Sequence, residues 1–275
     1  MQATQAAPLE YVDVNGVPML SATNLNSTGR VQAYFSTRIG GVSEGIPGAL
    51  NLNIFKKIDQ ANAPANFDVF CGALGFDKSI LVANRETHTN IVTFPDKHSV
   101  KANVFDPTQY IEADGMITKC RDICLFIYGS DCALFLLFDP KKDVIAAFHA
   151  GRAGSLNGII GNVIRAMQER YGCNSDDILV AVSPSICQKC YCVDEPIRDE
   201  FLACDPLFSR FILQRGEKYH LDLHNINLRI LTQAGIKKEN IAISSYCTMC
   251  DKDLFHSYRR DKGANGVNGA IIRFV

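Results

Sequence analysis

Short apolar runs separated by polar turns dominate the middle of the chain, and they predict the strands of a buried β-sheet. Three such runs follow one another at 123–128, 132–138 and 144–149. Their apolar side chains are continuous rather than alternating, which is typical of strands covered on both faces. Further apolar runs predict strands at 31–37, 178–182, 241–246 and 270–274.

Other segments carry apolar side chains at the spacing of a helix. Ser155 is the predicted N-cap of one helix that Gly172 ends, and its apolar stripe comprises Leu156, Ile159, Ile160, Val163, Ile164 and Met167. Further helices are predicted at 61–75, 195–203 and 222–234.

The order of these elements predicts the fold class. Strands and helices mix without regular alternation, so we expect an α/β fold in a single domain over 1–275, with mixed β-sheets flanked by helices. Residues 1–30 are expected to form a peripheral N-terminal segment. A plain dinucleotide-binding fold is disfavoured, because no predicted strand leads into a Gly-x-Gly-x-x-Gly helix start.

The overall composition narrows the class of partner. The chain has 275 residues, of which 47% are hydrophobic and 21% charged, and its net charge is -1. This balance argues against nucleic acid as a main partner, because binding the phosphate backbone needs a concentrated basic surface. No apolar stretch approaches the roughly 20 residues of a membrane helix. The N-terminus lacks the pattern of a signal peptide, so we expect a cytoplasmic protein that binds no membrane.

Three metal-competent residues stand at the ends of predicted strands. His88 follows a strand-like run, Cys132 opens an apolar strand directly after Asp131, and His149 ends another before a glycine-rich turn. Polar residues in such places are typical of enzyme sites, and two imidazoles with one thiolate can hold zinc with one position open. The alternative is two core histidines and a buried thiol. The neighbouring Asp131 and the glycine turn favour a shared site.

The eleven cysteines are expected to be free thiols or metal ligands, because their number is odd and the predicted compartment is reducing. Two Cys-x-x-Cys pairs could form a structural zinc site, one at Cys187 and Cys190, with Cys192 nearby, and one at Cys247 and Cys250. The gap between the pairs is far longer than in zinc ribbons or fingers. Buried reduced thiols are therefore the preferred interpretation.

Two arginines are candidates for binding an anion. Arg38 follows a strand and precedes a Gly-Gly turn that contains Ser43, and Arg259 lies in a basic cluster near the C-terminus. An arginine beside free backbone N–H groups suits phosphate or carboxylate. The alternatives are a solvated surface turn and an ion-paired strand end.

The motifs, taken in order, resemble those of the YfiH-like family, long labelled laccase-domain or polyphenol oxidase proteins. Two of them are Ser130-Asp131-Cys132 and His149-Ala150-Gly151. The others lie at 38–43, 51–53, 87–88, 113–118, 184–186, 219–223, 247–248 and 257–261. The resemblance covers nearly the whole chain from about residue 31.

The resemblance implies a cysteine hydrolase-type α/β fold with zinc held by His88, Cys132 and His149. It also implies purine nucleoside phosphorylase activity, with adenosine deaminase and methylthioadenosine phosphorylase activity at the same site. The sequence leaves open whether the chain is a monomer or a homodimer. Purine nucleoside and phosphate would be the substrates. Arg38, in the turn with Ser43, is the first choice to hold phosphate and Arg259 the second. Asp131 would orient His88 or His149, or handle a proton.

This sequence departs from the family pattern near the expected site. The family usually has His-Ala-Gly-Trp-Arg-Gly, but here Arg152 follows Gly151 directly and the chain contains no tryptophan. Glu86 replaces a usual glutamine, and Ser183 a usual glycine. The chain has six histidines and no His-x-His pair, so the older multicopper oxidase label fits poorly. The metal ligands are retained, whereas the residues around base and phosphate differ.

Two other functions remain open from the sequence. In one, Cys132 is the nucleophile of a cysteine hydrolase or deamidase and His149 is its base. In the other, the chain is a degenerate member that binds a ligand without turnover, which the altered turn around Arg152 motivates.

Overall fold

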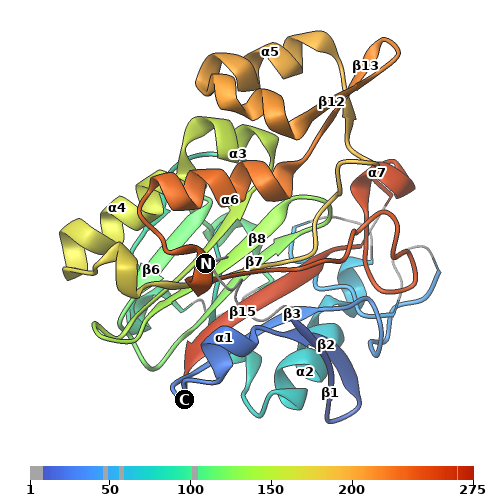
Figure 1. Cartoon of the computed structure of the whole chain (residues 1–275). Helices are drawn as coiled ribbons and strands as arrows, with labels where there is room; N and C mark the ends of the chain where they lie inside the picture. Colours follow the sequence, from blue (N-terminus) through green and yellow to red (C-terminus); the bar gives the residue numbers. More distant parts are fainter. Residues whose placement is uncertain (1–8, 46–48, 56–58, 101–104, 265) are drawn as a thin grey trace.

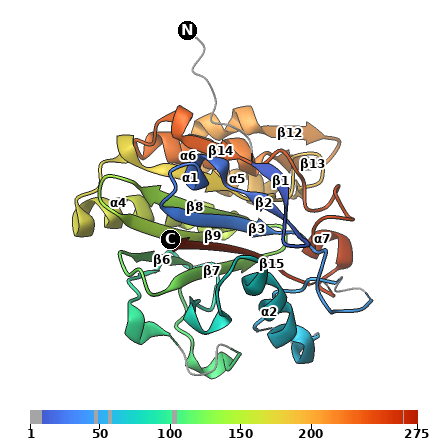
Figure 2. The ribbon, with the colours of Figure 1, turned by 90° about the horizontal axis from the view of Figure 1, so that it is seen from below.

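A computed structural model describes residues 9–45, 49–55, 59–100, 105–264 and 266–275 of the chain. Two six-stranded mixed sheets lie against each other, with helices on their outer faces (Figures 1 and 2). This arrangement confirms the predicted α/β class in a single domain. No helix in the described ranges is long and apolar enough to cross a membrane.

The first sheet has the strand order β1-β2-β3-β15-β7-β4. Its strands are β1 Glu10–Val14, β2 Val17–Ser21, β3 Val31–Ser36, β15 Asn268–Phe274, β7 Cys124–Gly129 and β4 Leu81–Val82. Residues 9–30, expected to be peripheral, supply two of these strands and α1 Thr23–Asn26. Leu20 and Leu25 in this segment are fully buried, so it is part of the core.

The second sheet has the strand order β14-β10-β8-β9-β6-β5. Its strands are β14 Ile241–Ile243, β10 Leu179–Val182, β8 Ala133–Asp139, β9 Val144–Ala150, β6 Gly115–Thr118 and β5 Val92–Thr93. A small third sheet consists of β11 Cys192–Val193, β13 Lys218–Leu221 and β12 Ile212–Arg215.

The central strands are apolar at every position because both of their faces are covered. On β8, Leu134, Leu136 and Phe138 pack toward the first sheet. The alternate residues of the strand, such as Phe135 and Leu137, pack against the helices on the other side. This two-sided burial is the reason that the predicted strands match the observed ones in this region.

Helices cover both outer faces of the paired sheets (Figures 1 and 2). Helix α2 Ala63–Ala73 packs on the first sheet, and α4 Ile159–Tyr171 and α6 Leu223–Gln233 pack on the second. Helix α5 Glu195–Cys204 packs with the third sheet. The short 3-10 helices are Gln60–Asn62, Lys78–Ile80, Lys97–Ser99, Pro107–Gln109, Ser175–Asp177, Pro206–Phe211 and Lys238–Asn240.

The helix predicted after Ser155 is divided in the structure. Helix α3 Arg152–Asn157 ends at Gly158, whose φ of +83° suits glycine, and α4 begins at the next residue. Ser155 is therefore not an N-cap. It lies inside α3 and donates its hydroxyl to Asn227 Oδ1 at 2.8 Å. Leu156 of the predicted stripe lies in α3, whereas the rest of the stripe, from Ile159 to Met167, and the end at Gly172 are confirmed for α4.

Candidate metal centre and active site

Strands β8 and β9 place Cys132 and His149 at the same end of the second sheet. The two strands are antiparallel, and Leu134 is opposite His149 in their register. Cys132 directly precedes β8, and His149 is close to the end of β9. Neighbouring strands lie about 4.8 Å apart, so this pairing alone brings the thiol and the imidazole together.

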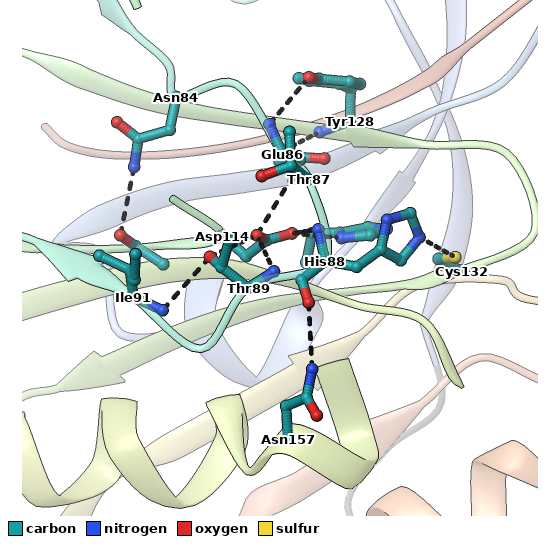
Figure 3. Close-up of polar contacts among 12 residues, drawn as sticks. Asn84, Glu86, Thr87, His88, Thr89, Ile91, Asp114, Tyr128, Cys132 and Asn157 are labelled. Atoms are coloured by element: carbon teal, nitrogen blue, oxygen red, sulfur yellow. Dashed lines mark hydrogen bonds and ion pairs between the residues drawn. The ribbon is translucent and has the colours of Figure 1, made fainter. Parts of the chain in front are cut away.

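His88 reaches the same place from a loop that the carboxylate of Asp114 holds (Figure 3). This carboxylate accepts hydrogen bonds from the backbone N–H groups of Thr87, His88 and Thr89, at 3.3, 3.1 and 2.6 Å. It also accepts one from the Thr89 hydroxyl at 2.7 Å. His88 has a φ of +64°, which residues other than glycine rarely adopt. These hydrogen bonds therefore stabilise an unusual backbone conformation.

Asp114 also orients His149. Its Oδ1 accepts a hydrogen bond from His149 Nδ1 at 2.9 Å, and both residues are buried. Because Nδ1 is occupied, Nε2 is the nitrogen that remains for a metal. A carboxylate behind a histidine in this way is the usual support of a metal-binding imidazole.

The donor atoms of His88, Cys132 and His149 lie within 4.8 Å of one another. His88 Nε2 is 3.9 Å from Cys132 Sγ, and the two imidazole rings meet edge to face with centroids 5.0 Å apart. Two imidazoles, one thiol and a buried carboxylate behind one imidazole suit zinc. All three donor residues line one cavity, so a fourth position would face it.

Gly151 makes this approach possible. A Cβ at residue 151 would clash with the Cys132 sulfur, and it would lie 3.3 Å from His88 Cδ2. No larger residue fits there without displacing the donors. The glycine turn that pointed to a site in the sequence therefore has a steric reason.

The charges in this group are coupled. Burial raises the pKa of the Cys132 thiol, but the charge of His149 and hydrogen bonds from His149 and His88 outweigh burial and bring the pKa to about 6. Burial lowers the pKa of His149, but the Cys132 charge and Asp114 raise it well above its ordinary value. The thiolate form, which both binds metals and attacks electrophiles, is thus favoured.

The cavity in front of these donors has a volume of about 600 Å³, within the range of small-molecule sites. Tyrosines and aliphatic residues make up much of its wall, and two arginines also line it. Its lining residues are Glu86, His88, Tyr128, Gly129, Ser130, Asp131, Cys132, His149, Arg152, Ala153, Ile186, Tyr191, Tyr258, Arg259 and Val267.

Asp131 lines the cavity, but its carboxylate accepts hydrogen bonds from Thr248 and Arg259 and not from the histidines. Its carboxylate accepts from the Thr248 hydroxyl at 2.7 Å and from the Arg259 backbone N–H at 2.6 Å. The histidine-orienting role expected of Asp131 therefore belongs to Asp114. The sequence contained Asp114 within a family motif, but nothing local linked it to His149.

Arg259 is placed at the cavity, as expected for a residue that would meet an anion. Its guanidinium donates to the Cys192 carbonyl at 3.0 Å and lies over the Tyr191 ring, 5.4 Å from the centroid. Arg152 also lines the cavity and pairs with Glu200 at 2.7 Å.

Arg38 and Ser43 do not appear among the described residues that line the cavity. Arg38 donates to the Lys252 carbonyl at 2.9 Å. Ser43 is buried, where its hydroxyl contacts Asp59 and accepts a hydrogen bond from Asn66 at 2.7 Å. In this structure the Ser43 hydroxyl supports its own turn.

Glu86 is a cavity residue whose role the sequence did not indicate beyond its departure from the family. Its Oε1 accepts from the Tyr128 backbone N–H at 2.9 Å, and its own N–H donates to the Tyr128 hydroxyl at 3.1 Å. Its Oε2 is buried without a hydrogen-bond partner among the described residues. Burial raises the pKa of this carboxyl well above its ordinary value.

Comparison with known proteins adds a family context. Residues 32–275 match the model of a family described as multi-copper polyphenol oxidoreductase laccase. The chain is 33% identical over 257 residues to a purine nucleoside phosphorylase of Deinococcus radiodurans, covering 94% of this chain and 93% of the relative. It is 30% identical over 190 residues to adenosine deaminase RL5 of an unknown prokaryotic organism, covering 68% and 72%.

A solved structure shares the fold over nearly the whole chain. The crystal structure of the Bacillus licheniformis hypothetical protein YfiH superimposes with a TM-score of 0.87 and 28% identity. The superposition covers 94% of this chain and 96% of that protein.

Proposed function

The chain belongs to the family described as multi-copper polyphenol oxidoreductase laccase, and we propose that it is a zinc-dependent purine nucleoside phosphorylase. This is the YfiH-like family that its sequence motifs resemble. The proposal includes adenosine deaminase and methylthioadenosine phosphorylase activity at the same site. One observation carries it: a group of two histidines and a cysteine opens onto a cavity of about 600 Å³, within the range of small-molecule sites. Relatives named for phosphorolysis and deamination of purine nucleosides support it.

In this proposal His88, Cys132 and His149 hold the zinc. When bound, the zinc would act as a Lewis acid that polarises an oxygen of water or phosphate. Asp114 keeps His149 in the tautomer that presents Nε2, and Gly151 leaves room for the donors. Copper oxidase chemistry has less support. A multicopper centre needs many histidine ligands, but this group contains two of the six histidines.

The cavity wall offers distinct surfaces to the two substrates. Tyr191, Tyr258, Ile186 and Val267 provide apolar contact area that suits a purine ring. Arg259 supplies positive charge for phosphate, and its stacking on Tyr191 limits the orientations of the guanidinium. The phosphate role expected of Arg38 passes to Arg259 in this proposal.

In phosphorolysis, a phosphate oxygen attacks the anomeric carbon, the glycosidic C–N bond breaks and the purine leaves with its bonding electrons, needing a proton. In deamination, water adds to the purine carbon that bears the amino group, and ammonia leaves. The chain itself binds and orients the substrates in both reactions. Asp131 is the carboxylate we place for proton transfer, and its bonds from Thr248 and Arg259 hold it at the cavity.

Product analysis by chromatography tests the proposal. Adenosine is incubated with zinc-loaded protein, with and without phosphate. Adenine that forms only with phosphate indicates phosphorolysis, and inosine that forms without phosphate indicates deamination. Cys132→Ala should lose the zinc of the His88, Cys132 and His149 group and both products together, whereas the control Cys120→Ala should keep them. No product from protein shown to hold zinc at His88, Cys132 and His149 would overturn the proposal and favour a ligand-binding protein without turnover.

A second candidate is a cysteine hydrolase or deamidase. The observation in its favour is the alignment of a thiol, an imidazole and a carboxylate in Cys132, His149 and Asp114, with the Cys132 pKa at about 6. Alkylation by iodoacetamide separates the two functions. A nucleophile reacts quickly with and without zinc in the protein, whereas zinc shields a ligand thiolate.

A further inference from the structure

Four cysteines outside the described active site come together where two neighbouring strands end. Strands β10 and β14 are parallel, with Val182 opposite Ile243, and a further bridge links Ser185 to Cys247. The loop after β10 carries Cys187 and Cys190, and the loop after β14 carries Cys247 and Cys250. Strand pairing therefore places the two Cys-x-x-Cys pairs side by side despite their distance in the sequence.

The four sulfur atoms lie within 4.8 Å of one another. Those of Cys190 and Cys250 are 3.3 Å apart. Sulfur atoms around a tetrahedral zinc, with Zn–S bonds of about 2.3 Å, are about 3.8 Å apart. The cluster thus has the dimensions of a tetrathiolate zinc site.

Each pair spans a turn that backbone hydrogen bonds hold. The N–H groups of Cys190 and Tyr191 donate to the Cys187 carbonyl at 3.0 and 2.9 Å. In the other loop the Asp251 N–H donates to the Cys247 carbonyl at 2.9 Å. The Cys187 N–H also donates to Cys247 Sγ at 3.3 Å, the type of bond that stabilises a thiolate ligand.

We propose that Cys187, Cys190, Cys247 and Cys250 form a structural zinc site, separate from the group of His88, Cys132 and His149. Four thiolates complete the coordination, so no position is left for a substrate, and the role is structural. Cys192, which the sequence placed with this group, lies outside it in β11 and pairs with His220 there.

The proposed zinc would hold one wall of the cavity. Ile186 and Tyr191 line the cavity on either side of the first pair. The Ile186 N–H donates to the Asp131 carbonyl at 3.0 Å, and Thr248, within the second pair, donates its hydroxyl to the Asp131 carboxylate. The two loops thus position cavity residues, and zinc would fix them relative to each other. This role does not depend on which reaction the cavity catalyses.

Metal analysis of Cys132→Ser tests this site without using activity. The variant is expressed in zinc-supplemented medium, and its zinc content is measured by plasma mass spectrometry after gel filtration. We expect about one equivalent to remain. Cobalt substitution of the same variant should give the charge-transfer and visible bands of tetrahedral tetrathiolate cobalt. Cys132→Ser combined with Cys250→Ser should lose the metal, whereas combination with Cys192→Ser should retain it.

Two results would overturn the proposal. One is folded Cys132→Ser protein without zinc or cobalt. The other is an intact mass and peptide map of this protein, purified under reducing conditions, that shows a Cys190–Cys250 disulfide. Should the double variant with Cys250→Ser fail to fold, the metal content of Cys132→Ser alone still decides. Failure of the proposed purine chemistry would leave this measurement unchanged.

Discussion

Asp114→Asn should weaken zinc binding at the group of His88, Cys132 and His149, because Asp114 holds two of these residues in place. The carboxylate accepts from His149 Nδ1, from three backbone N–H groups of the His88 loop and from the Thr89 hydroxyl. An asparagine keeps one accepting oxygen, and its NH₂ group faces donors at the other position. If the oxygen stays toward Thr89, the NH₂ group faces His88 N–H and His149 Nδ1.

The magnitude follows from these contacts. Losing two hydrogen bonds to a charged group costs about 1.5–3 kcal/mol each, so the metal-free protein should lose roughly 3–6 kcal/mol of unfolding free energy. The amide also favours the His149 tautomer with the proton on Nε2, which cannot bind a metal. Removal of such a supporting carboxylate lowers metal affinity by about 10- to 100-fold, or roughly 1.4–2.8 kcal/mol.

The assay is zinc competition with a chromophoric chelator at pH 7, together with urea unfolding of the metal-free protein. Asp131→Asn is the matched control, because Asp131 lines the same cavity and contacts Thr248 and Arg259 instead. It should leave the affinity of the histidine–cysteine site unchanged. Equal zinc affinity of the histidine–cysteine site in Asp114→Asn and wild type would refute the reasoning. Thr89→Val, which removes one bond to Asp114, provides a milder variant if Asp114→Asn does not fold.

Three further predictions concern the glycine turn, the anion contact and pH. Gly151→Ala should lose metal from the active site and all turnover, because its Cβ would clash with the Cys132 sulfur; metal analysis and product chromatography check this. Arg259→Ala should raise the KM for phosphate about tenfold or more, equivalent to about 1.4 kcal/mol, and spare phosphate-independent deamination; equal losses in both reactions would argue against a phosphate contact. Burial lowers the pKa of His256 to about 4, against about 6.5 in the unfolded chain. As the pH drops from about 6.5 toward 4, the unfolded state takes up a proton that the folded state does not, so the folded state becomes less stable. Between pH 7.5 and pH 5 this group should cost about 2 kcal/mol in urea unfolding, and His256→Gln, which can still donate to Leu50, should remove that share of the pH dependence.

Much of the secondary structure could be predicted because buried strands and helices have characteristic local patterns of apolar residues. Strands β7, β8 and β9 are apolar on both faces, and the sequence shows this directly. The break at Gly158 was missed, because the apolar stripe of α4 continues the pattern of α3 closely enough to hide it. The short strands β1 and β2 carry too little pattern for the sequence to show that they extend the first sheet.

The candidate site was predictable only in part. His88, Cys132 and His149 could be selected because each stands at the end of a strand-like run. The partner of His149 could not, because Asp131 and Asp114 are equally plausible carboxylates in the sequence. Strand β6 lies beside β9, with Gly115 opposite Phe148, and this pairing brings Asp114 to the imidazole.

The sequence by itself determined the fold class, the central strands and the donor residues, because these depend on side-chain chemistry and on periodicity over a few neighbouring positions. The tertiary structure decided which residues meet. The pairing of β10 with β14 joins two cysteine pairs that the sequence keeps far apart, and the packing of the loops places Arg259 rather than Ser43 at the cavity. Contacts of this kind depend on strand order and register, which are properties of the whole packed chain and are not encoded in any one segment.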